Sequence, residues 1–149
     1  SKGFTLIELL VVIGILAVLL AITLIAINPA RQFSQANNTK RTSDVNAILN
    51  AINQYMADNK GNTPAGIPST PAAPLEISTG GANICSSLMT LYMAALPSDP
   101  KTGAPAGSVT NCAAAYNTRY DVIKSGTDNR ITVSSMDEEL PPTIISVTR

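Results

Sequence analysis

The sequence predicts an α+β fold: a long amino-terminal helix, hydrophobic in its first half, that packs on a small antiparallel β-sheet head. Three observations predict it. Residues 9–27 are apolar and uncharged, residues 30–60 repeat apolar positions with a helical period, and the last third is rich in β-branched and aromatic residues. A chain of 149 residues suits one domain.

The composition argues against several classes of function. Ten basic and ten acidic residues give zero net charge, which disfavours a nucleic-acid surface built on bulk positive charge. The chain has no His and only two Cys, so a His base, a His metal ligand and a four-Cys zinc site are all excluded. No phosphate-binding glycine motif occurs. We therefore expect no enzyme, cofactor or metal.

The apolar run at residues 9–27 spans about 28 Å as a helix, roughly the hydrocarbon thickness of a bilayer. One interpretation is a cleaved signal peptide, whose hydrophobic region is normally shorter. The other is a membrane anchor, and the length favours the anchor.

Glu8 lies between apolar neighbours at the start of this run. A carboxylate in lipid is costly unless it reaches water or a partner. Glu8 therefore either marks the wet edge of the membrane or meets a positive charge at the same depth.

Residues 2–13 read KGFTLIELLVVI, which resembles the processing site and helix start of type IV pilins and pseudopilins. The resemblance implies that a prepilin peptidase cuts between Gly3 and Phe4, so that residues 1–3 are a leader remnant, and that the new Phe4 amine is N-methylated. It also implies a membrane platform protein and, acting through it, a cytoplasmic assembly ATPase.

In such proteins the hydrophobic helix, here residues 4–28, holds the subunit in the cytoplasmic membrane before assembly and afterwards forms the core of a helical filament. Glu8 would then pair with the Phe4 amine of a neighbouring subunit. Both charges are costly in lipid and each lowers the cost of the other, so only one stagger of the subunits satisfies both. We expect Glu8→Ala to leave processing intact and to block or cripple assembly.

Residues 29–60 form the second predicted helix, amphipathic and ending at Gly61. Pro29 is a predicted helix break, and Gly14 is the internal soft point of the hydrophobic helix. One stripe is apolar: Val45, Ile48, Leu49, Ile52, Tyr55 and Met56. The stretch before it is polar apart from Phe33. Its cations Arg31, Lys40 and Arg41 are expected on a solvated or inter-subunit face, in preference to a surface for lipid heads or DNA.

Residues 61–149 are the predicted head. Residues 62–82 are expected to be a loop without helix or strand, because prolines recur at Pro64, Pro68, Pro71 and Pro74. Ser69 and Thr70 are candidate glycan sites, although a bare loop is favoured. A short helix is expected at residues 87–95. The turns that follow, LPSDPKTG at residues 96–103, are similar to those of many pseudopilins and small pilins.

Strands are expected at residues 116–123, 130–135 and 143–148, with a hairpin turn at residues 124–129. Pro141 and Pro142 separate the last strand from the preceding one. The resulting antiparallel sheet should pack on the apolar stripe of the second helix.

Cys85 and Cys112 are predicted to form a disulfide, since they lie outside the membrane segment in an exported domain. Two unpaired buried thiols are the alternative. The carboxylates of the last third allow a calcium hypothesis, but they follow no recognised loop spacing, so a solvated acidic face is favoured: Asp121, Asp128, Asp137, Glu138 and Glu139.

The resemblance implies a structural subunit that polymerises into a surface filament for adhesion, motility or DNA uptake. One alternative is a pseudopilin or minor subunit of a type II secretion or competence system, which the turns at residues 96–103 favour. An alternative of another class is a membrane-anchored extracytoplasmic binding domain that never polymerises.

Overall fold

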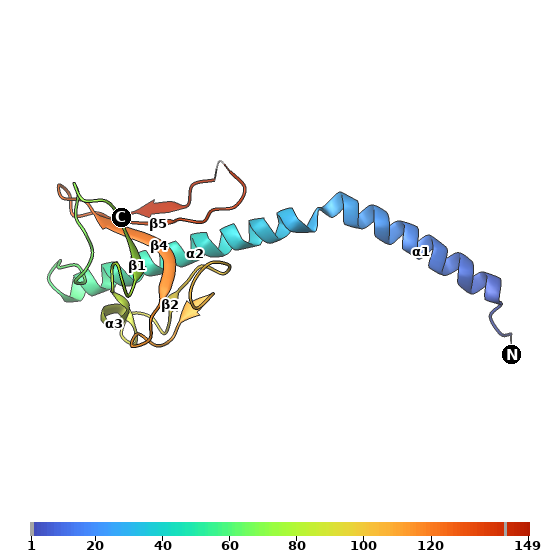
Figure 1. Ribbon diagram of the computed structural model, residues 1–149, viewed down its shortest axis with the longest axis horizontal. Helices are drawn as coiled ribbons and strands as arrows, with labels where there is room; N and C mark the ends of the chain where they lie inside the picture. Colours follow the sequence, from blue (N-terminus) through green and yellow to red (C-terminus); the bar gives the residue numbers. More distant parts are fainter. Residues whose placement is uncertain (1, 142) are drawn as a thin grey trace. The chain divides into compact units, whose positions relative to one another are not determined.

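The computed structural model describes residues 2–141 and 143–149 and divides the chain into two compact units, Ser1–Ser34 and Gln35–Arg149 (Figure 1). Two predictions fall outside the described residues. They are the leader position Ser1 and the strand-separating Pro142.

Helix α1 spans Leu6–Ile27 and ends at Asn28, which has left-handed backbone angles (φ 46°). The predicted soft point at Gly14 is not a break in this structure, because α1 runs through it. Glycine keeps its amide donor and costs a helix only about 1 kcal/mol. The interruption is at Asn28, a residue type that tolerates the left-handed region.

Helix α2 spans Pro29–Asp58, and Pro29 is its first residue. That position needs no amide donor, so proline starts this helix. The predicted apolar stripe is confirmed: Val45, Ile48, Leu49 and Ile52 are fully buried, and Tyr55 and Met56 pack against the same core. At its end the amide of Gly61 (φ 85°) donates to the Met56 carbonyl at 2.7 Å.

A four-stranded antiparallel sheet supplies the other half of the core. Its order is β1-β4-β5-β6, with β1 Leu75–Ser78, β4 Asn117–Lys124, β5 Ile131–Ser135 and β6 Ser146–Thr148. Alternate residues of β4 and β5 point inward and are buried with the α2 stripe: Thr118, Tyr120, Val122, Ile131 and Val133. The small β2–β3 pair (Leu96–Pro97 and Ser108–Val109) and the single turn α3 (Cys85–Leu88) complete the head.

The structure corrects three predicted elements. Residues 62–82 are not wholly loop, because β1 begins directly after the last proline and pairs with β4. The predicted helix at residues 87–95 is only the turn α3, since Met89 is extended and Thr90 has φ 72°. The last predicted strand, residues 143–148, shortens to Ser146–Thr148.

Candidate functional site

The segment before α1 is extended and exposed. Gly3, Phe4 and Thr5 have no regular secondary structure, and the Phe4 side chain is 90% exposed. The peptide bond between Gly3 and Phe4 therefore lies outside the helix, where a peptidase can reach it.

Thr5 and Glu8 form a capping box at the start of α1. The Glu8 carboxylate accepts hydrogen bonds from the Thr5 amide (2.8 Å) and the Thr5 hydroxyl (2.6 Å). The Glu8 amide donates to the Thr5 hydroxyl oxygen (3.3 Å). The amides of Thr5 and Glu8 thereby gain hydrogen-bond partners, and the Glu8 carboxylate is held at the start of α1.

The surface of α1 is apolar all round and packs on nothing in the chain, since none of its residues is buried. Within the residues that the structure describes, one helix is long and apolar enough to cross a membrane, and that helix is α1. An unpacked helix of this kind needs lipid or other helices around it.

Comparison with known proteins agrees with this geometry. The family model described as "Prokaryotic N-terminal methylation motif" matches residues 1–24. A relative from Thermus thermophilus, described as "Type IV wide pilus major component PilA4", is 39% identical over 79 residues. Both matches support a relationship to type IV pilins. The match covers 48% of this chain and only 59% of the length of the relative. No solved structure matches significantly.

The structure brings three predicted site residues of the pilin segment together at one end of α1: Gly3, Phe4 and Glu8. Pro29 lies apart from them at the start of α2, and Gly14 lies in the uninterrupted middle of α1.

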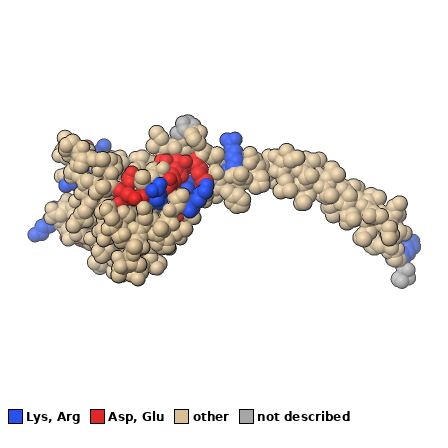
Figure 2. Space-filling model, viewed as in Figure 1, with Lys and Arg blue, Asp and Glu red and all other residues tan. Residues whose placement is uncertain are grey.

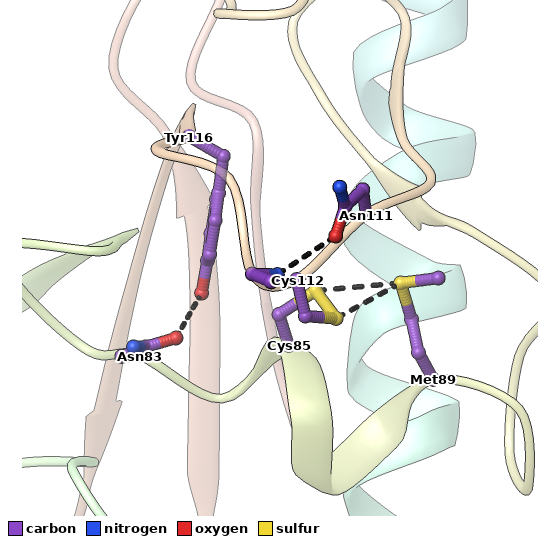
Figure 3. The surroundings of a disulfide bond; sticks show 7 residues. Asn83, Cys85, Met89, Asn111, Cys112 and Tyr116 are labelled. Atoms are coloured by element: carbon purple, nitrogen blue, oxygen red, sulfur yellow. Dashed lines mark hydrogen bonds between the residues drawn. A yellow bond between two sulfur atoms is a disulfide. The ribbon is translucent and has the colours of Figure 1, made fainter.

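The predicted disulfide is confirmed: Cys85 in α3 is bonded to Cys112, with 5.5 Å between the Cα atoms (Figure 3). The Met89 sulfur contacts both cysteine sulfurs, at 3.3 and 3.2 Å. Tyr116 is nearly buried beside the bridge, and its hydroxyl donates to Asn83 Oδ1. The disulfide joins α3 to the segment before β4 and so cross-links two distant segments of the head.

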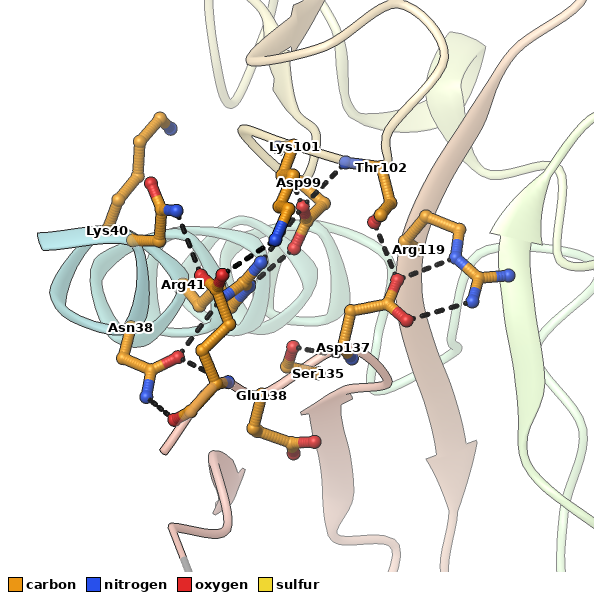
Figure 4. A network of polar contacts seen from close by, with 12 residues as sticks. Asn38, Lys40, Arg41, Asp99, Lys101, Thr102, Arg119, Ser135, Asp137 and Glu138 are labelled. Atoms are coloured by element: carbon orange, nitrogen blue, oxygen red, sulfur yellow. Dashed lines mark hydrogen bonds and ion pairs between the residues drawn. The ribbon is translucent and has the colours of Figure 1, made fainter. Parts of the chain in front are cut away.

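The sequence-based expectation for Arg41 is wrong. Arg41 is fully buried, and its guanidinium bonds to both oxygens of the fully buried Asp99 (2.5 and 3.2 Å) and to Glu139 (3.0 Å) (Figure 4). Arg41 is therefore part of the polar core and is not on a solvated or inter-subunit face. Its position four residues before Val45, in phase with the apolar stripe, is the signal that would have found it.

The LPSDPKTG turns hold Asp99 in place beside Arg41. The Asp99 carboxylate also accepts the amides of Lys101 (2.8 Å) and Thr102 (2.9 Å). A Cβ on Gly103 would come within 2.7 Å of the Asp99 carbonyl oxygen, so only glycine closes this turn. Burial raises the pKa of Asp99, but the hydrogen bonds from Arg41 and the two amides outweigh it and lower the pKa to about 2.

The acidic residues of the last third are not a simple solvated face. Figure 2 shows Asp and Glu side chains gathered on one face of the head with Lys and Arg among them. Asp137 forms two bonds with Arg119 (2.8 and 3.0 Å), and Glu139 bonds Lys101 (2.9 Å) as well as Arg41. Hydrogen bonds from Lys101, Asn37 and Arg41 lower the pKa of Glu139 to about 2. Internal cations thus pair with two of the five carboxylates that suggested calcium, Asp137 and Glu139.

Proposed function

We propose that this chain is a structural subunit of a type IV pilus, which polymerises with identical copies into a helical surface filament. One observation carries the proposal. A helix with a processing motif at its start exposes its entire apolar surface, and many copies of that helix would bury it together.

A prepilin peptidase would remove residues 1–3, and methylation would follow on the Phe4 amine. Before assembly, α1 would span the cytoplasmic membrane and hold the head outside. Force for assembly would come from a cytoplasmic ATPase acting through a membrane platform protein. After assembly the chain would lie in an extracellular filament that serves adhesion, motility or DNA uptake.

Glu8 would guide assembly by pairing with the Phe4 amine of a neighbouring subunit. Its carboxylate has no cationic partner among the described residues of its own chain, where Thr5 alone binds it. In an apolar filament core an unpaired carboxylate and an unpaired ammonium are both costly, and pairing offsets the two costs.

Glu8→Gln separates the charge of this residue from its capping role, because glutamine also completes a capping box. We expect the variant to be processed normally and to give few or no filaments in the sheared fraction. Asp128→Asn removes one charge from an exposed turn of the head and serves as the matched control. Normal filament yield from Glu8→Gln contradicts the pairing.

The intact mass of the chain in filaments sheared from cells tests the function itself. Abundant chain with the mass of residues 4–149 plus one methyl group supports a processed pilus subunit. Chain found only in membranes contradicts the pilus proposal and favours a pseudopilin, which the LPSDPKTG turns also suggest, or an anchored binding domain.

A further inference from the structure

The axial position of α2 in the head depends on side-chain contacts. Covalently, α2 joins the sheet only through the long connection of residues 59–74. The disulfide does not hold it, because Cys85 and Cys112 both lie outside α2. Nothing in the connectivity therefore prevents α2 from sliding along its own axis.

The apolar stripe of α2 repeats at each helical turn, so a shifted register would still bring mostly apolar side chains to the core. A shift by one helical turn, three or four residues, exchanges apolar for apolar side chains along the stripe: Val45 with Ile48 or Leu49, Leu49 with Ile52, and Ile52 with Tyr55 or Met56. Apolar burial alone discriminates weakly between such registers, since it is non-directional.

The polar contacts of α2, in contrast, distinguish one register of the helix from another. Arg41 meets Asp99 where both side chains are fully buried. Asp44 accepts a bond from the Tyr120 hydroxyl (2.9 Å), and Asn38 bonds both backbone groups of Glu139. A shift by three or four residues would place Asn37, Asn38, Asp44 or Val45 opposite Asp99 in place of Arg41, and none of these side chains is a cation.

We propose that Arg41 is a positioning residue that selects a single register of α2 in the head by pairing with Asp99. When α2 slides, one apolar neighbour takes the place of another, whereas a buried carboxylate without its cation is strongly penalised. The role is independent of polymerisation and adds to the proposed pilus function.

The test measures the register directly in the full-length chain in detergent micelles. Nitroxide labels are placed on cysteines at Ala47 on α2 and Asp128 in the turn between β4 and β5, both exposed. Labelling without reductant preserves the native disulfide. A slip of one turn moves Ala47 by about 5.4 Å along the helix axis, which dipolar spectroscopy resolves as a second distance.

The decisive variant is Arg41→Met combined with Asp99→Asn, which removes both charges together, and the asparagine retains an oxygen for the Lys101 and Thr102 amides. We expect it to fold and to show two label distances. The unmodified chain and Arg41→Lys, which keeps the cation, should show one.

Lys40→Met is the matched control, because it removes the adjacent cation of the same helix, whose side chain is 43% exposed and pairs with Asp44. It should show one distance. The proposal is overturned by a single unchanged distance in the folded double variant, by a second distance in Lys40→Met, or by failure of the double variant to fold, which would assign the pair to stability instead.

Discussion

Thr5 and Glu8 form reciprocal hydrogen bonds across the first turn of α1. The threonine hydroxyl accepts the Glu8 amide while the glutamate carboxylate accepts the Thr5 amide. The helix therefore starts at Leu6, and the Gly3–Phe4 bond, where cleavage is proposed, stays outside the helix.

Thr5→Ala should loosen this start by about 1 kcal/mol, the usual cost of losing an N-cap side chain. We expect faster amide hydrogen exchange at Glu8 and Leu9, whose amides bond Thr5, in micelles and no change beyond Gly14. Thr5→Ser retains the hydroxyl and should exchange like the unmodified chain. Equal exchange in the alanine and serine variants contradicts the role of the hydroxyl.

Asp99→Asn should destabilise the head by about 3–5 kcal/mol, because it leaves Arg41 buried with only Glu139 as an anionic partner. The free energy of unfolding from urea titration measures the loss. Asp128→Asn, in an exposed turn, is the control and should cost little. A loss below about 1 kcal/mol for Asp99→Asn would show that the buried pair is well compensated.

The head should lose stability in acid through Asp99 and Glu139. Both folded-state pKa values are depressed to about 2, whereas ordinary unfolded values are about 3.9 and 4.3. The stabilising contribution is therefore fully present above the unfolded values and disappears as the pH falls toward 2. We expect a constant Tm from about pH 7 to 5 and a fall below that.

Glu139→Gln removes one of these two groups and should flatten the fall of Tm in acid. A Tm that does not change down to about pH 2.5 would contradict the depressed pKa values.

Reduction of the disulfide should cost the head about 3–4 kcal/mol, the chain-entropy value for a bridge between cysteines 27 positions apart. A guanidinium titration with and without reductant measures it, with reduction verified by the mass gain of two hydrogens. The Cys85→Ser, Cys112→Ser variant should match the reduced chain and should not respond to reductant. An unchanged midpoint in the verified reduced chain refutes this expectation.

The sequence was sufficient for features with a local or periodic signal. The α2 stripe, the hairpin between β4 and β5 and the amino-terminal motif all follow from residues close together in the chain. The pairing of Arg41 with Asp99 did not follow, because Asp99 lies 58 positions away in a loop whose conformation sequence rules do not give.

Strand β1 was missed for a related reason. Its four residues follow a proline-rich stretch and are too few to show a clear alternation of apolar and polar side chains. They form a strand by pairing with β4. Long-range pairing of this kind overrides local propensity. The sequence predicts the helix break at Pro29, because proline lacks an amide donor. In the structure the break is caused by the left-handed backbone angles of Asn28.

Asn28 also divides the helical backbone of the amino-terminal half into α1 and α2. The backbone hydrogen bonds of α1 end at this residue, and the unit that begins at Gln35 has its own core and disulfide. The fold of α1 depends on an apolar environment around the helix, because none of its residues is buried. The fold of the head depends on its own hydrophobic core. Heat that melts the head therefore need not unravel α1. In the proposed membrane-bound subunit, α1 would keep an unfolded head tethered at the membrane surface, where the head could refold.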